Sequence, residues 1–216
     1  MRRSGFTILQ LIVVLAIIII LAGVMFPIIC RSPGNAQRAS CQSNLKNVAL
    51  GIKQYIQDTD GKYQFPPVNI NDVAISEDNP LGWADALNPY IKSNRIFWCP
   101  SQTENDKRDN SLTKPSDRDY TDYYYNRRLA GVEEEKIADT ALTVLLGEGN
   151  DGTDAANARY SLTSVPAAWI KNKESPTRRH FDGSNFAFVD GHVKWYKAGT
   201  VGAKKHDGSS ATFATR

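Results

Sequence analysis

Four residues near the C-terminus have side chains that commonly bind metal ions: His180, Asp182, Asp190 and His192. Imidazole nitrogens and carboxylate oxygens are zinc ligands, so a metal-dependent hydrolase is the sharpest enzyme hypothesis. The spacing argues against it, because a tight turn separates Asp190 from His192 and their side chains need not converge. The chain also lacks the H-E-x-x-H, P-loop and G-x-S-x-G patterns. We therefore predict a non-enzymatic protein with no catalytic residue and no metal centre.

A second group of oxygen-bearing side chains, in the segment 148–154, could bind calcium: Glu148, Asn150, Asp151 and Asp154. Calcium prefers such ligands, but their spacing does not match the EF-hand pattern. We predict that the protein has no cofactor, and a calcium site is the weaker alternative.

Three cysteines leave one thiol outside any disulfide: Cys30, Cys41 and Cys99. Cys30 ends an apolar run, where a partner is least expected. Cys41 lies on the apolar stripe of a predicted helix, and Cys99 follows an aromatic run, so we expect both to face one core. A Cys41–Cys99 disulfide is the favoured alternative, and two buried free thiols are the other.

Tyrosines at position 120 and at 123–125 precede Arg127 and Arg128. Aromatic rings beside arginines can stack on single-stranded nucleic acid. Successive residues of a strand point to opposite faces, however, so a strand with partly buried tyrosines is the better interpretation. We expect no nucleic-acid partner.

Composition places the apolar residues at one end of the chain. The 216 residues include 26 basic and 23 acidic side chains, so the net charge is only +3. This near balance does not favour nucleic acid as the main partner, and the length fits one membrane-anchored domain. The mean hydropathy is −0.41, although residues 11–30 carry no charge. The rest of the chain must therefore be markedly polar.

The apolar run 11–30 is long enough to cross a bilayer. At about 1.5 Å per residue it reaches about 30 Å, the thickness of the hydrocarbon core. Arg2 and Arg3 precede it, which predicts a cytoplasmic N-terminus and an exported body. No small-residue cleavage site follows the run, so we expect a retained single-pass anchor.

Downstream of the run, Pro33 and Gly34 interrupt the helical periodicity and predict a hinge. Apolar residues at steps of three and four then predict an amphipathic helix from about Asn35 to the Asp-Thr-Asp-Gly segment that ends at Gly61. Strands are expected over 143–147, 185–189 and 192–196. The Asp-Gly dipeptide between the last two predicts a type I′ hairpin.

The segment from Gly5 to Ala16 resembles the class III leader of type IV pilins and type II secretion pseudopilins. The resemblance implies cleavage between Gly5 and Phe6 by a prepilin peptidase, with N-methylation of Phe6. Pro27 then lies where many pilin helices carry a helix-bending proline; a plain kink of a membrane helix is the alternative.

The chain departs from the leader pattern at Gln10, where most of the family carries glutamate. In the family this carboxylate is thought to neutralise the amine of a neighbouring subunit. Glutamine carries no charge, so its contact should be weaker. The alternative is that Gln10 is a tolerated polar residue near the membrane surface.

A second motif consists of a histidine, nine further residues and an Asp-Gly pair. Its defining residues are His180, Asp190 and Gly191. It resembles the H-X9-DG motif that closes a subgroup of bacterial pilin-like proteins, and segments 40–46 and 98–100 are also similar to that group. In physical terms the Asp-Gly pair suits a tight turn, and His180 could hydrogen-bond the hairpin or nearby backbone.

The resemblance implies an α+β, pilin-like fold, in which a long N-terminal helix packs on a small antiparallel sheet. The expected organisation is a basic leader at 1–5, a transmembrane and assembly helix at 6–30, and an amphipathic helix at 31–61. A periplasmic or extracellular domain at 62–196 and a polar tail at 197–216 follow.

The expected function is that of a non-enzymatic pseudopilin or minor pilin in a type II secretion or type IV pilus-like filament at the inner (cytoplasmic) membrane. Filament assembly would involve Gln10 and Pro27. The partners would be a prepilin peptidase, other pilin or pseudopilin subunits and inner-membrane lipid. The alternative, which Gln10 favours, is a membrane-tethered module that binds an extracytoplasmic ligand without polymerising.

Overall fold

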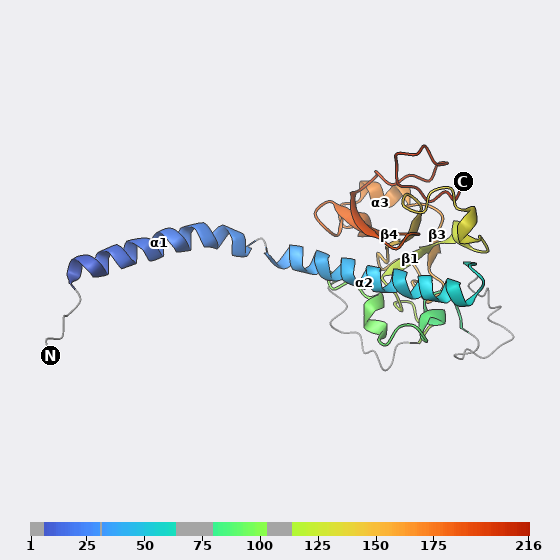
Figure 1. Cartoon of the computed structure of the whole chain (residues 1–216), viewed down its shortest axis with the longest axis horizontal. Helices are drawn as coiled ribbons and strands as arrows, with labels where there is room; N and C mark the ends of the chain where they lie inside the picture. Colours follow the sequence, from blue (N-terminus) through green and yellow to red (C-terminus); the bar gives the residue numbers. More distant parts are fainter. Residues whose placement is uncertain (1–6, 31, 64–79, 103–113) are drawn as a thin grey trace. The chain divides into compact units, whose positions relative to one another are not determined.

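The computed structural model describes residues 7–30, 32–63, 80–102 and 114–216. The chain divides into two compact units, Met1–Ala36 and Gln37–Arg216. Figure 1 shows α1 in the first unit and the sheet in the second. The predicted processing residues, Gly5 and Phe6, lie outside the described residues.

Helix α1 spans Ile8–Cys30 and continues through Pro27. A reciprocal capping box closes its first turn: Gln10 Oε1 accepts the Thr7 N–H at 3.0 Å, and Thr7 Oγ1 accepts the Gln10 N–H at 3.4 Å. Among the residues that the structure describes, no helix combines the length and apolarity needed to cross a membrane. The transmembrane role of 6–30 stays a prediction.

Helix α2, Ser32–Asp58, begins before the expected start at Asn35. Pro33 and Gly34 lie in its first turn, where proline is tolerated because its missing N–H would have no helical partner. The predicted apolar stripe is confirmed, with Tyr55 only partly buried against the same core. The other members are fully buried or nearly so: Cys41, Leu45, Val48, Ala49, Ile52 and Ile56.

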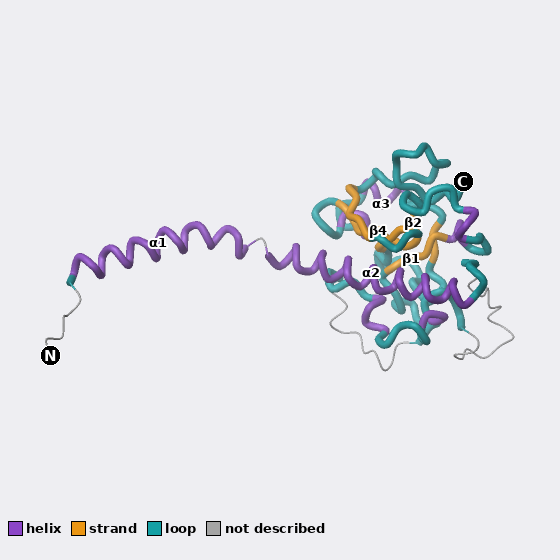
Figure 2. The backbone as a smooth tube through the Cα atoms, in the orientation of Figure 1, coloured by secondary structure: helices purple, strands orange, loops and turns teal. Residues whose placement is uncertain are grey.

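The second unit contains a five-stranded sheet in the order β3-β1-β2-β4-β5. The strands are β1 Tyr123–Asn126, β2 Val144–Glu148, β3 Ser161–Leu162, β4 Gly183–Phe188 and β5 Val193–Lys197. Figure 2 shows how much of the surrounding chain is loop. The α+β class is confirmed, but the purely antiparallel sheet is wrong, because β3 pairs with β1 in parallel. A long connection from β2 precedes this short edge strand, so no tight hairpin sets its direction.

The tyrosines of β1 alternate between two cores, as the strand prediction requires. Tyr123 and Tyr125 pack in the core that contains the α2 stripe. Tyr124 belongs to the core on the other face, together with Trp169 of α3 (Ala167–Lys171) and Phe213. All three tyrosines are buried, so β1 is covered on both faces.

The segment 197–216 is not a simple polar tail, and this part of the prediction is wrong. Phe213 is fully buried against Tyr124, with ring centroids 6.0 Å apart. Thr212 bridges to Thr143 and to Gly202. A short apolar stretch among polar residues therefore completes the second core. The average polarity of the whole segment conceals this stretch.

The hairpin between β4 and β5 also differs from the expected type I′ turn. Of the Asp-Gly pair only Gly191 has a positive φ, 86°. Phe188 O accepts the Gly191 N–H at 2.8 Å, and Phe188 N–H donates to His192 O at 2.9 Å. The loop thus has three residues, 189–191, with glycine in the left-handed position. The Asp190 carboxylate stabilises it by accepting the His192 N–H at 3.0 Å.

Two buried tyrosines of the second core provide a matched stability test. The Tyr124 hydroxyl is buried without a hydrogen-bond partner among the described residues, whereas Tyr160 donates to Asp154 Oδ2 at 2.7 Å. Tyr124→Phe should therefore raise the free energy of unfolding by about 1 kcal/mol, and Tyr160→Phe should lower it by about 1 kcal/mol. Urea denaturation followed by tryptophan fluorescence measures both. Equal effects in the two variants would contradict the assignment.

The same tyrosine predicts sensitivity to alkali. Burial raises the pKa of Tyr124 well above its usual value. The unfolded chain loses this proton near about pH 10 while the folded chain keeps it, so stability is complete below that pH and decreases above it. Between about pH 10 and 11 the stability should fall less steeply for Tyr124→Phe than for the parent. Parallel slopes would show that Tyr124 does not contribute.

Candidate functional site

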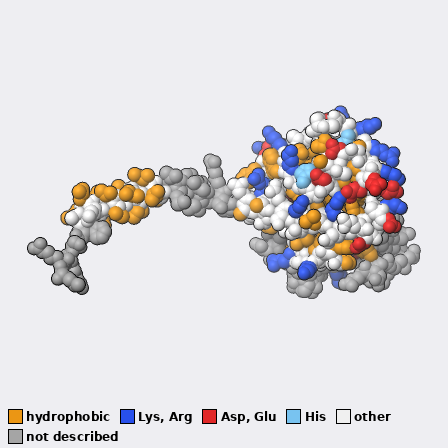
Figure 3. Space-filling view, viewed as in Figure 1, with side chains coloured by type: hydrophobic (Ala, Val, Ile, Leu, Met, Phe, Trp, Pro, Cys, Tyr) orange, Lys and Arg blue, Asp and Glu red, His pale blue; other side chains and the backbone are white. Residues whose placement is uncertain are grey.

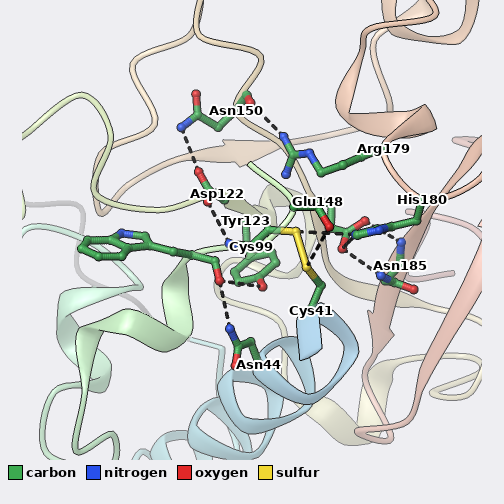
Figure 4. Close-up of a disulfide and its surroundings, with 12 residues drawn as sticks. Cys41, Asn44, Cys99, Asp122, Tyr123, Glu148, Asn150, Arg179, His180 and Asn185 are labelled. Carbon is green, nitrogen blue, oxygen red and sulfur yellow. Dashed lines mark hydrogen bonds and ion pairs between the residues drawn. A yellow bond between two sulfur atoms is a disulfide. The ribbon is translucent and has the colours of Figure 1, made fainter. Parts of the chain in front are cut away.

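Four buried side chains from four parts of the chain meet in the second unit (Figure 4). We call Cys41, Cys99, Glu148 and His180 the disulfide centre. Cys41 comes from α2, Cys99 follows the 3-10 turn Asn94–Phe97, Glu148 ends β2, and His180 precedes β4. Their sulfur, nitrogen and oxygen ligand atoms all lie within 4.8 Å of one another.

Cys41 and Cys99 form a disulfide with a Cα–Cα distance of 5.1 Å. Of the two alternatives that the sequence leaves open, the structure therefore contains the covalent one. The bond joins α2 to the segment after the 3-10 turn, across a sequence separation of 58. It fixes the helix to the part of the chain that carries Phe97 and Trp98 of the core.

Glu148 is a carboxylate with no solvent exposure. Its Oε1 accepts from His180 Nε2 at 2.9 Å and from Asn185 Nδ2 at 2.8 Å, and its Oε2 accepts the Asn185 N–H at 2.8 Å. A buried charge is tolerated only when it is paired and hydrogen-bonded. These three donors meet that requirement, and they join the end of β2 to β4 and the turn before it.

An unusual turn aims His180 at Glu148. The two residues after it, Phe181 and Asp182, have φ values of 55° and 65°, which are uncommon for residues other than glycine. Each such residue costs on the order of 1 kcal/mol or more. The turn is held by the His180 N–H bond to Gly183 O at 2.9 Å and by Trp195 Nε1, which donates to His180 O at 2.7 Å. The contacts of His180 therefore offset a backbone cost.

Further hydrogen bonds position the cysteine side of the centre. Asp122 Oδ2 accepts the Cys99 N–H at 2.8 Å, and Asp122 Oδ1 accepts from Asn150 Nδ2 at 3.1 Å. Asn44 of α2 donates to Trp98 O at 2.9 Å. Burial, followed by the negative charges of Glu148 and Asp122, raises the pKa of Tyr123 well above its usual value. The surroundings of the disulfide are thus polar and buried.

The four potential metal ligands near the C-terminus, from which the sequence analysis expected no metal centre, do not come together. His180 is buried against Glu148, whereas Asp182 pairs with Arg178 on a more exposed surface. Asp190 Oδ1 instead contacts His192 Nδ1 at 2.6 Å. The four side chains are divided among three separate interactions.

The two ends of the H-X9-DG motif lie beyond opposite ends of β4 and have different contacts. The His180 ring bonds a carboxylate that the sequence did not indicate, while its backbone bonds Gly183 and Trp195 of the hairpin, as the sequence suggested. Asp190 shapes the hairpin loop, while Gly191 O accepts from Lys46 Nζ of α2. Sequence reasoning missed Glu148 as the partner of His180. The only available signal was an acidic residue at the end of a buried strand.

The alternative calcium ligands are bonded to other groups of the protein. Glu148 belongs to the disulfide centre, and Asn150 bonds Asp122. Asp151 Oδ2 accepts from Trp169 Nε1 at 2.7 Å, and Asp154 accepts from a tyrosine hydroxyl. The last three bonds, to Asp122, Trp169 and Tyr160, position the 149–160 loop.

The two residues predicted to act in assembly, Gln10 and Pro27, belong to the first unit. Pro27 is within α1, and Gln10 caps the helix that contains it. The Thr-x-x-Gln spacing that identifies a capping box is visible in the sequence, and the sequence reasoning overlooked it. Comparison of the chain with protein-family models, curated proteins and solved structures found no match in any of the three.

Removing the disulfide measures what it contributes. Its loop of 58 positions predicts that Cys41→Ala combined with Cys99→Ala lowers the free energy of unfolding by about 4 kcal/mol. Cys30→Ala leaves this pair intact and is the control. Urea denaturation of the three proteins checks the value. A loss below about 1 kcal/mol would show that apolar packing and hydrogen bonds hold α2 on the sheet without the covalent link.

Proposed function

We propose that this chain is a non-enzymatic structural subunit, a pseudopilin or minor pilin, of a type II secretion or type IV pilus-like filament. The observation that supports the proposal is the character of α1. All its described side chains, residues 8–23, are exposed, and all are apolar or glycine except Gln10 (Figure 3). A helix that is apolar on every side needs an apolar cover. Inner-membrane lipid before assembly, and the helices of other pilin or pseudopilin subunits after it, would supply that cover.

The construction of the second unit is compatible with display outside the cytoplasm. Disulfides persist mainly in oxidising compartments, and here one of them joins α2 to the core. The chain would therefore keep a folded domain after export. Processing by a prepilin peptidase between Gly5 and Phe6, with methylation of Phe6, belongs to the same proposal.

Gln10 supports a minor rather than a major role. Its side chain accepts the Thr7 N–H within its own helix. A neutral amide also attracts a neighbouring amine less strongly than a carboxylate does in an apolar bundle. Such a subunit would join a filament with a weaker contact at this position.

A second candidate function is a tethered module that binds a ligand without polymerising. It is favoured by a polar hollow of about 410 Å³ in the second unit. The hollow is lined by, among others, Gln102, Asn150, Lys173, Arg178 and Arg179. Its charged lining would suit a small polar ligand.

Processing can be tested on the native chain. Co-expression with a prepilin peptidase should give a mature protein that begins at N-methylated Phe6, because the basic leader is removed on the cytoplasmic side. Intact mass and N-terminal sequencing measure this. A mature chain that begins at Met1, or one that starts after Cys30 and is free of lipid, would contradict the proposal.

Assembly can be tested with a charge in α1. Ile17→Lys places an ammonium in an apolar bundle, so it should reduce the chain in sheared filament fractions at least tenfold. Lys205→Ala, at an exposed position of the second unit, should leave incorporation unchanged. Immunoblots of sheared and membrane fractions report both. A parent chain abundant in membranes and absent from every filament fraction would favour the tethered module.

A further inference from the structure

We propose that the disulfide centre, once its cysteines are reduced, binds one divalent metal ion of the zinc class. The ligands are Cys41 Sγ, Cys99 Sγ, His180 Nε2 and a carboxylate oxygen of Glu148. Oxidation of the two cysteines to the disulfide expels the ion. This inference concerns the second unit and does not depend on filament assembly.

The ligand set and its geometry suit zinc. Two thiolates, one imidazole and one carboxylate are ligands that a tetrahedral zinc site accepts. With zinc–sulfur bonds of about 2.3 Å, the two sulfurs would lie about 3.8 Å apart. The four ligand atoms already lie within 4.8 Å of one another, and all four residues are buried. Reduction would let the two sulfurs separate, and small shifts of the His180 nitrogen and the Glu148 oxygen, now 2.9 Å apart, would complete the site.

Surrounding hydrogen bonds hold the ligands in place before any metal arrives. Asn185 binds both oxygens of Glu148, and Asp122 holds the Cys99 backbone. Trp195 fixes the backbone of His180. Outer contacts of this kind orient metal ligands and strengthen binding. The strained turn after His180 is part of the same arrangement.

A neighbouring cation compensates the charge of the metal-bound form. Two thiolates and one carboxylate carry three negative charges, so a divalent ion leaves one. Arg179, next to His180, donates Nη2 to Gly149 O at 2.9 Å. Its Nη1 is buried and has no hydrogen-bond partner among the described residues. This half-buried guanidinium therefore provides a positive charge beside the disulfide centre.

The redox and proton changes balance. A phosphine reductant converts the disulfide to two thiols and is itself oxidised to a phosphine oxide. One water molecule supplies the oxygen of the phosphine oxide and the protons of the two thiols. Metal binding releases the two thiol protons. The proton that Nε2 of neutral His180 shares with Glu148 in the oxidised form moves to Nδ1, so that Nε2 can bind the metal. A small-molecule disulfide reverses the redox step: the two cysteine thiolates form their disulfide, two small thiolates leave, and the metal is freed.

Cobalt(II) titration of the full chain tests the site. The protein carries Cys30→Ala, so that Cys41 and Cys99 are its only thiols, and is reduced with a phosphine. We expect one cobalt per chain, with a thiolate-to-cobalt absorption band and tetrahedral visible bands, and displacement by zinc. The oxidised protein should show neither band. Absence of the thiolate band after reduction, or equal binding by the oxidised protein, would overturn the proposal.

Variants assign the two other ligands. His180→Ala and Glu148→Gln should each weaken cobalt binding at least tenfold. His192→Ala removes a histidine that contacts Asp190, away from the centre, and should bind as the parent does. Glu148→Gln is similar in shape to the parent residue, so it tests the ligand even if His180→Ala does not fold. Parent-like affinity in Glu148→Gln would overturn the four-ligand assignment.

Discussion

The constraint that organises the second unit is a carboxylate, Glu148, that has no access to water. Removing such a charge from solvent costs several kcal/mol unless its hydrogen bonds are replaced. His180 and Asn185 replace them, and this requirement fixes the end of β2 against the start of β4. Because the disulfide lies against the same histidine, the contact also determines where α2 meets the sheet. The contacts of one buried charge thus position the helix, the sheet and the disulfide relative to one another.

The rest of the fold covers the two faces of the sheet around this centre. The α2 stripe meets Tyr123 and Tyr125 on one face, and the C-terminal segment with Phe213 meets Tyr124 on the other. Consecutive tyrosines in β1 therefore pack in both cores. Because their hydroxyls are buried, the stability of the fold should decrease in alkali. The apolar α1 belongs to a different unit, and its described side chains, residues 8–23, are all exposed. This contrast motivates an assembly role for α1 and a folded, displayed role for the second unit.

Local patterns could be predicted from the sequence, and long-range pairings could not. Helical periodicity identified the buried side of α2, and apolar runs located β2, β4 and β5. Four features escaped: the parallel β3, the buried Phe213, the three-residue hairpin loop and the Glu148–His180 pair. Each depends on a partner distant in sequence or on backbone dihedrals that composition does not specify. In the candidate site, the apolar neighbours of Cys41 and Cys99 in the sequence predicted that both cysteines face one core. No spacing rule connects a histidine to a glutamate 32 positions away.

The central functional claim is that α1 packs against helices of other subunits. A photoreactive amino acid at Ile19, an exposed residue of α1, tests it directly in cells. Irradiation should give cross-linked species that contain two or more copies of this chain, or this chain with another helical subunit, resolved by mass spectrometry. Adducts to lipid alone, under conditions in which filaments are present, would contradict the account.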